Sequence, residues 1–166
     1  LTTAEKQRAV VGLLVDPPDR QVIDLEAMLT SIVEGARTEY STAAIETDCV
    51  GDCSIRAVSQ IRCAFVELLD NALTHNTEGD PTVEITVTED DAGVTVRICD
   101  NGPPIPEHEF RTLTGERELS EVYHGTGMGL WLVYLAVGVS GGTIDFTQEG
   151  CGNTITLEFD RPDHRT

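Results

Sequence analysis

Gly125-Thr-Gly127-Met-Gly129-Leu130 places a glycine at every second position directly before the apolar run Leu130–Val139. This pattern predicts a helix start with exposed backbone N–H groups, and the partial positive charge there favours phosphate binding. It is not a Walker A loop, because no Gly-Lys-Ser/Thr follows, nor a dinucleotide fingerprint, because a long irregular segment and not a strand precedes it. A flexible hinge is the alternative interpretation.

A second motif, Glu67-Leu-Leu-Asp-Asn71-Ala, lies on a helix predicted from about Ile55 to Thr74. Glu67 and Asn71 are four residues apart and therefore project from one face of that helix. Their oxygens suit Mg²⁺, and Glu67 can also hold a metal-bound water or act as a general base. Taken alone, this spacing is more typical of a solvated polar face, and only the glycine motifs favour a site.

A third motif, Asp100-Asn-Gly102, follows the predicted strand Val94–Cys99. A carboxylate only accepts hydrogen bonds, so Asp100 can bind the exocyclic amine of adenine, where guanine presents a carbonyl oxygen. A plain Asp-Asn-Gly turn is the alternative. The stiff stretch Pro103-Pro-Ile-Pro106 argues against it, because it carries the chain away instead of closing a hairpin.

Hydrophobic periodicity predicts an α/β two-layer sandwich, with helices over one face of a mixed, mainly antiparallel sheet. Residues 1–22 are expected to be a linker or the tail of an upstream segment, 23–160 the domain, and 161–166 a tail. The segment Asn101–Thr126 lacks periodicity and is predicted to be a lid. The remaining predicted elements are a strand or helix tail at Val10–Val15, a helix capped by Asp24, a strand at Ala44–Val50, a hairpin of Val83–Val87 and Val94–Ile98, a helix from Leu130 to Gly141, and a closing hairpin of Thr143–Gln148 and Thr154–Phe159.

Charge is the second distinctive property of the chain. Eleven basic residues, of which only Lys6 is a lysine, face 29 acidic ones, giving a net charge of −18. Such a field repels nucleic acid and anionic membranes, and we interpret it as adaptation to a salt-rich cytoplasm; an ordinary acidic domain is the alternative. The longest apolar run is too short to cross a bilayer. The five cysteines are expected to be small buried residues in a reducing compartment.

In this order and spacing, the three motifs resemble the N, G1 and G2 boxes of the ATP-binding domain shared by sensor histidine kinases, gyrase-type ATPases, Hsp90 and MutL. The resemblance runs from about Ile23 to Asp160 and is closest to the catalytic domain of sensor histidine kinases. It implies a Bergerat-type ATP-binding fold with ATP and Mg²⁺ as ligands.

The resemblance also implies roles for individual residues. Asn71 would coordinate Mg²⁺ together with Glu67, and Asp100 would bind the adenine amine. Thr74 stands where many of these kinases have a phosphate-contacting Lys or Arg, and Glu67 where many have Asn. The remaining implied binding residues are Gly102 at the base, Gly125, Thr126, Gly127, Met128, Gly129 and Leu130 around the phosphates, His75 as a candidate phosphate contact, and Thr154, whose hydroxyl would support Asp100.

The implied activity is transfer of the ATP γ-phosphate to a histidine on a dimerisation segment outside this chain, and then to an Asp on the receiver domain of a response regulator. His108, His124 and His164 lack the setting of a phosphoacceptor. The chain starts without Met, so we expect a piece of a longer protein, soluble or membrane-anchored. The alternatives are a gyrase-type ATP-hydrolysing clamp, an anti-sigma serine kinase and a non-catalytic nucleotide-binding module.

Overall fold

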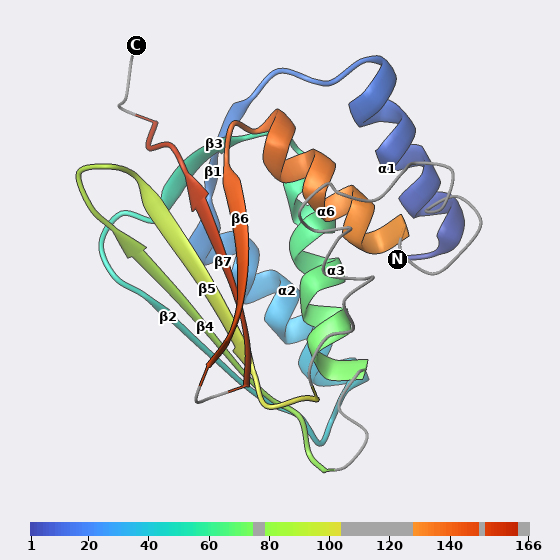
Figure 1. Ribbon diagram of the computed structural model, residues 1–166, viewed down its shortest axis with the longest axis vertical. Coiled ribbons are helices and arrows are strands. Elements are labelled where there is room, and N and C mark those ends of the chain that lie inside the picture. Colours follow the sequence, from blue (N-terminus) through green and yellow to red (C-terminus); the bar gives the residue numbers. More distant parts are fainter. Residues whose placement is uncertain (75–78, 104–127, 150–151, 163–166) are drawn as a thin grey trace.

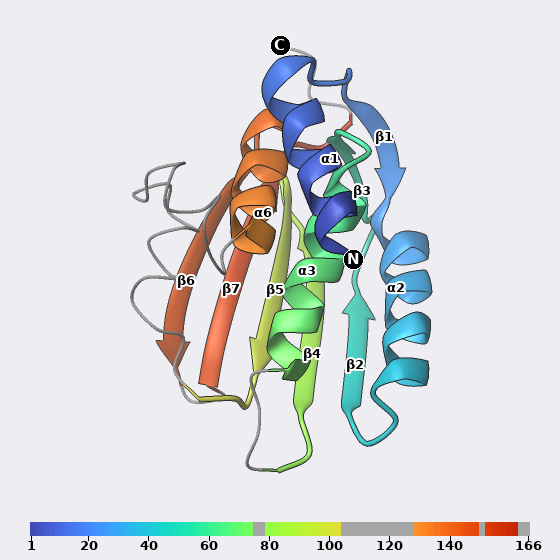
Figure 2. The ribbon, with the colours of Figure 1, turned by 90° about the vertical axis from the view of Figure 1, so that its right-hand side faces the viewer.

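A five-stranded mixed sheet with helices on one face forms the body of the domain (Figures 1 and 2). The computed structural model describes residues 1–74, 79–103, 128–149 and 152–162. The strand order is β2-β4-β5-β7-β6, and β1 and β3 form a separate two-stranded ribbon. The predicted α/β sandwich is confirmed. Its described elements are α1 (Thr3–Val15), β1 (Gln21–Asp24), α2 (Leu25–Glu39), β2 (Ala44–Cys49), β3 (Ser54–Ala57), α3 (Ile61–Thr74), β4 (Thr82–Glu89), β5 (Val94–Asp100), α6 (Met128–Val139), β6 (Thr143–Glu149) and β7 (Gly152–Phe159).

The inner face of the sheet is built from apolar residues that alternate along its strands. In the antiparallel β4–β5 hairpin, Ile85 pairs with Ile98 and Val87 with Val96, and β7 places Ile155 opposite Ile98. All five side chains are buried. Helices α2, α3 and α6 cover this face (Figure 1), so the predicted hairpins and their half-buried pattern are confirmed.

Helix α2 begins as predicted, because the Asp24 carboxylate accepts a hydrogen bond from the N–H of Ala27 at 3.2 Å. The chain then enters β2, which lies parallel to β4 with Ala44 opposite Thr82. A parallel pair requires a crossover, and here the crossover contains α3. Strand β2 thus forms one edge of the sheet.

One boundary differs from the prediction. Helix α3 begins at Ile61 and not at Ile55, because Ser54–Ala57 is a strand that pairs with β1. Ile55 and Ala57 are fully buried while Arg56 is exposed, which is the period of a strand. For Val10–Val15 a strand or a helix tail was expected, and the segment is the C-terminal half of helix α1, which agrees with the second alternative. Thr2 and Glu5 form a capping box at its start.

Among the described cysteines, Cys53 is a buried thiol as expected, whereas Cys99 differs from the expectation. Cys99 is disulfide-bonded, whereas Cys49, Cys53 and Cys63 are free thiols. Burial, with the neighbouring Cys53 adding to the effect, raises the pKa of the Cys49 thiol to about 12. Among the described residues, no helix is long and apolar enough to cross a membrane.

Candidate nucleotide site

The motifs on α3 and α6 are in direct contact. Glu67 is only 3% exposed, and a Cβ added to Gly129 would overlap with its Oε2 atom. The side chain of Glu67 therefore lies against the backbone at the start of α6, in space that only a glycine leaves free. Both views show α6 beginning beside the middle of α3 (Figures 1 and 2). Sequence segments about sixty residues apart thus meet at one place in the fold, as the combined motifs predicted.

Glu67 has an ion-pair partner that the motifs did not indicate. Lys6 on α1 places its Nζ atom 3.1 Å from Glu67 Oε1. Lys6 shares a helix face with Val10 and Leu13, which are buried, so the docking of α1 aims the ammonium at α3. The capping box at Thr2 and this helical spacing could have predicted α1, but not the contact with Glu67.

Asn71 lies one turn beyond Glu67 on α3 and is partly buried. Between them, Asp70 accepts a hydrogen bond of 3.5 Å from the hydroxyl of Tyr40. Burial, and then the charge of Asp70, raise the pKa of Tyr40. One carboxylate and one carboxamide oxygen on a single helix face fit Mg²⁺, which keeps waters and takes phosphate oxygens as further ligands. Within the described residues, no group of three or more acidic, His or Cys side chains forms an all-protein cage.

Asp100 ends β5 and is held as a buried acceptor. Its Oδ1 atom accepts hydrogen bonds from the N–H of Gly102 at 2.8 Å and from Nδ2 of Asn153 at 3.1 Å. Asn153 is 3% exposed and also donates to the carbonyl oxygen of Pro103 at 2.7 Å. Within the described residues both bonds to the carboxylate go to Oδ1, so Oδ2 is open to an incoming amine.

Asn153 is the residue that sequence reasoning missed, since the supporting contact was expected from Thr154. Asn153 lies opposite Asp100 in the register of β5 and β7, and Thr154 lies opposite Cys99. Successive side chains of a strand point to opposite faces, so a shift of one residue changes the face. The Thr154 hydroxyl accordingly donates to Cys99 Sγ at 3.6 Å.

The turn that carries Asp100 is fixed to neighbouring strands. The N–H of Thr82, at the start of β4, donates to Asn101 Oδ1 at 3.0 Å. Gly152, at the start of β7, has φ +121°, and a Cβ there would overlap with the carbonyl oxygen of Asp100. The strand ends thus hold the Asp100 carboxylate in a defined position before any ligand binds.

These features agree with a comparison to known families. The model of the histidine kinase-, DNA gyrase B-, and HSP90-like ATPase family matches residues 57–163. The chain belongs to this ATPase family. The matched segment contains all three motifs and Asn153, whereas Lys6 and the whole of α1 lie outside it.

Individual relatives of this ATPase family are distant. Sporulation kinase B of Bacillus subtilis (strain 168) is 27% identical over 150 residues, or 87% of this chain and 35% of that protein. The sensor-type histidine kinase PrrB of Mycobacterium leprae (strain TN) is 26% identical over 159 residues, or 94% of this chain and 35% of that protein. The chain thus spans only about a third of the length of these curated relatives.

Solved structures show the same fold. The histidine kinase AdeS of Acinetobacter baumannii superimposes with a TM-score of 0.72 at 17% identity, covering 96% of this chain and 77% of that one. The ATP binding domain of PrrB from Mycobacterium tuberculosis gives a TM-score of 0.68 at 24% identity, covering 88% and 100%. At these identities the likeness establishes the ATPase fold and nothing finer.

The residues predicted to bind phosphate are described in part. Met128, Gly129 and Leu130 form the first turn of α6, and the last two are buried. His75, Gly125, Thr126, Gly127 and most of the predicted lid, from residue 104 onward, lie outside the described residues. Thr74 is described, and its hydroxyl donates to the carbonyl oxygen of Asp70 at 2.8 Å, so its own helix satisfies it.

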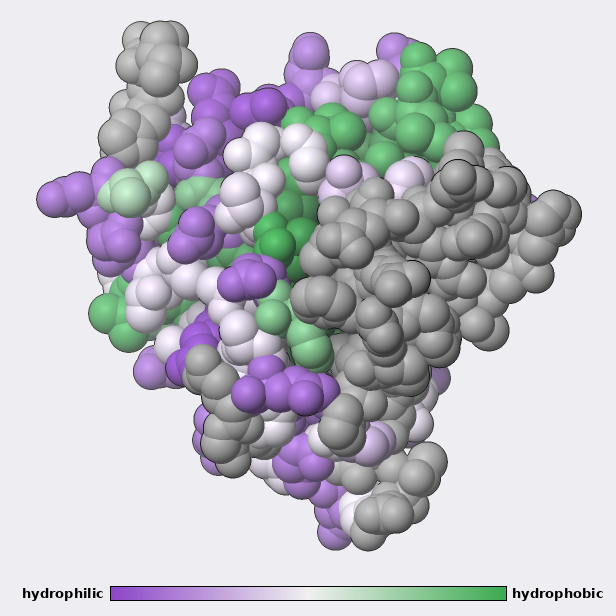
Figure 3. Space-filling model, viewed as in Figure 1, coloured by the Kyte–Doolittle hydropathy of each residue, from purple (hydrophilic) through white to green (hydrophobic). Residues whose placement is uncertain are grey.

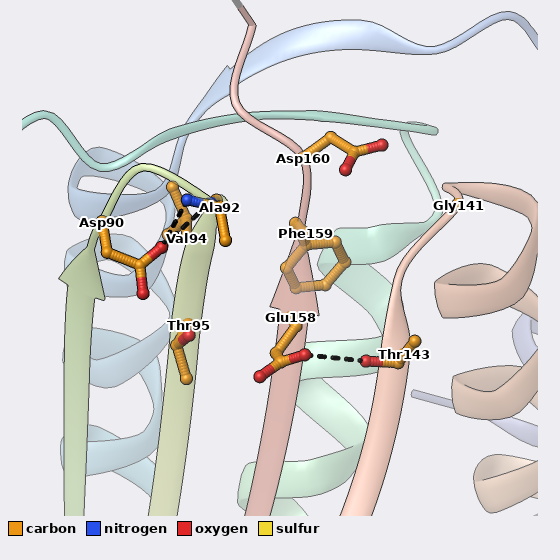
Figure 4. Close-up of a pocket in the computed structure, with 10 residues that line it drawn as sticks. Asp90, Ala92, Val94, Thr95, Gly141, Thr143, Glu158, Phe159 and Asp160 are labelled. Carbon is orange, nitrogen blue, oxygen red and sulfur yellow. Dashed lines mark hydrogen bonds between the residues drawn. The ribbon is translucent and has the colours of Figure 1, made fainter. Parts of the chain in front are cut away.

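A cavity of about 180 Å³ lies at the opposite end of β5 from Asp100 (Figure 4). Its lining includes the turn between β4 and β5 and the ends of β6 and β7. Two of its carboxylates have partners within the protein: Asp90 Oδ1 accepts from the N–H groups of Ala92 and Gly93, and Glu158 accepts from the Thr143 hydroxyl. None of the described residues that line this cavity belongs to the three motifs.

Proposed function

We propose that this chain is the ATP-binding catalytic domain of a sensor histidine kinase, which transfers the γ-phosphate of ATP to a histidine on a dimerisation segment outside this chain. Family membership and the names of the relatives support the proposal. The observation that carries it is Asp100, a carboxylate fixed by Gly102 and Asn153 with one oxygen open.

Asp100 would select adenine. As a carboxylate it accepts hydrogen bonds only, so Oδ2 can take a bond from the exocyclic amine of adenine but not from the carbonyl oxygen of guanine. The bonds to Oδ1 hold the carboxylate before the ligand arrives, which lowers the entropic cost of binding. Gly102 is only partly buried and offers side-chain-free backbone to the base.

Glu67, Asn71 and the first turn of α6 would bind the triphosphate end. The Asn71 carboxamide oxygen and the Glu67 carboxylate are the residues that would hold Mg²⁺, which supplies charge neutralisation for phosphoryl transfer. The first N–H groups of α6 have no hydrogen-bond partner within their own helix, and they lie beside Glu67, where developing negative charge would be favoured. Glu67 would also orient the attacking imidazole or accept its proton.

The proposed partners follow from this activity. They are the dimerisation and phosphoacceptor segment of the same protein and the receiver domain of a response regulator, which completes a two-component phosphorelay. We place the domain in a salt-rich cytoplasm, since the −18 net charge is tolerated best where salt screens it.

Titration calorimetry in molar KCl tests the nucleotide assignment. ATP and ADP should bind in preference to GTP, and Asp100→Asn should weaken adenine nucleotides by about 1 to 3 kcal/mol, the scale of a hydrogen bond to a charged group. Asp145→Asn is the matched control, because it removes the same charge from an exposed position on β6. Equal affinity for GTP and ATP would refute the assignment of Asp100. Steady phosphate release without any protein acceptor would instead favour a gyrase-type ATPase.

A further inference from the structure

The contact between Lys6 and Glu67 joins α1 to the centre of the proposed site. Lys6 Nζ lies 3.1 Å from Glu67 Oε1, and the two side chains are 27% and 5% exposed. Lys6 lies outside the segment that the ATPase family shares, residues 57–163, so the ion pair is a property of this chain beyond the family motifs. It is also the only lysine of the chain.

The Lys6 ammonium group and a bound metal ion would compete for the Glu67 carboxylate. Glu67 lies against Gly129 and one helical turn from Asn71, its proposed partner in holding Mg²⁺. A carboxylate so deeply buried has little water around it to screen two neighbouring cations from each other. An ammonium and a divalent ion on this one carboxylate therefore repel each other strongly.

We propose that Lys6 is a tethered cation of this site, which holds Glu67 when nucleotide is absent and is displaced when Mg²⁺ and nucleotide bind. The displacement loosens α1 from α3 and α6. The inference rests on the proposed function, because it assumes that Mg²⁺ and nucleotide bind beside Glu67.

Helix α1 is attached weakly enough to be displaced. It has 13 residues, a length at which an isolated helix is marginal in water, and only Val10 and Leu13 are buried. Its opposite face carries Val11, Leu14 and Val15, which are 47%, 45% and 78% exposed. Figure 3 shows the resulting hydrophobic area over α1, at the upper right of the view. The ion pair adds a modest contribution to the packing of Val10 and Leu13, so its loss should measurably loosen α1.

Lys6 does not replace the basic residue that is missing at Thr74. Thr74 lies seven residues beyond Glu67 on α3, which corresponds to about 10 Å along the helix axis. The Lys6 ammonium, in contact with Glu67, is therefore at the metal end of the motif and not at the position of Thr74.

Hydrogen exchange on the wild-type chain tests the inference without any variant. Amides of α1 are measured in molar KCl with no addition, with Mg²⁺ alone, with a non-hydrolysable ATP analogue alone, and with both. We expect exchange in α1 to rise at least about threefold with both ligands, which is the scale of losing one modest ion pair. Unchanged or slower exchange of α1 in the presence of both would overturn the proposal.

A pair of variants gives a second readout. Lys6→Met should lower the Mg²⁺ concentration at half-maximal analogue binding by about threefold to tenfold, because the competing cation is gone. Arg8→Met removes the same charge from an exposed position of α1 and should leave this midpoint unchanged. A midpoint that stays equal or rises in Lys6→Met also overturns the proposal. If calorimetry detects no nucleotide binding to the wild type, the proposed function fails; if nucleotide binds and α1 does not respond, only the role of Lys6 fails.

Discussion

Replacing Asn153 with alanine should disconnect Asp100 from β7 and weaken adenine binding. The amide of Asn153 donates to Asp100 Oδ1 at 3.1 Å and to the Pro103 carbonyl oxygen at 2.7 Å. A hydrogen bond to a charged group contributes about 1.5 to 3 kcal/mol and a neutral one about 0.5 to 1.5 kcal/mol. Both are buried, so water replaces them only in part.

The expected result is a loss of about 2 to 3 kcal/mol in unfolding free energy and a roughly 10- to 100-fold lower affinity for ATP. Chemical denaturation and titration calorimetry, both in molar KCl, separate the two effects. Folded protein that binds ATP poorly is the expected outcome, because Asp100 remains present but is no longer held in place.

Thr154→Val is the informative comparison. Thr154 is equally buried, one residue further along β7, and bonded to Cys99 Sγ on the other face of the sheet. ATP affinity should fall far less in Thr154→Val than in Asn153→Ala. If the valine variant loses as much affinity as the alanine variant, or more, the assignment of Asn153 as the support of Asp100 is wrong.

Three further outcomes are expected. Gly129→Ala would force Glu67 to move and should slow phosphoryl transfer to a supplied dimerisation segment by about 100-fold, the scale of a 1 Å misplacement. Gly138→Ala is the control: no atom lies within 4 Å of the added Cβ, so it should stabilise α6 by about 0.5 to 1 kcal/mol, and equal transfer rates in the two variants would contradict the prediction. Glu67→Gln keeps a side-chain oxygen that can still bind Mg²⁺, so ATP affinity should change far less than transfer, which should slow roughly 10²- to 10⁴-fold; transfer at the wild-type rate would reduce Glu67 to a metal-shell or structural role. The thermal midpoint should rise from dilute buffer to molar KCl, where the Debye length is about 3 Å, and a flat response would exclude stabilisation by salt screening.

Local patterns predicted most of the fold. The alternation of Val83, Ile85 and Val87 with polar residues is enough to place a half-buried strand, and Asp24 before an apolar helical pattern is enough to place a helix start. The proximity of Glu67 and Gly129 followed from the order and spacing of the motifs. These signals lie within a few residues of one another along the chain, or in motifs that resemble a known domain.

The features that the sequence did not predict correctly have a different physical origin. Ile55–Ala57 is a strand only because β1, some thirty residues earlier, pairs with it. Asn153 and Thr154 are neighbours in sequence, and which of them faces Asp100 depends on the register of β5 and β7, which a single residue inverts. The ion pair of Lys6 depends on how α1 docks on α6 and α3. Each of these depends on tertiary pairing between distant segments.

The position of β2 has a consequence for where the domain can be shortened. The segment shared with the ATPase family starts at residue 57, but β2 (Ala44–Cys49) precedes it and pairs along β4. Removing everything before residue 57 would leave the backbone N–H and C=O groups of β4 unpaired along a new sheet margin. Such a margin can recruit strands from other molecules, so the shortened protein would tend to self-associate through β4 even with every nucleotide motif intact.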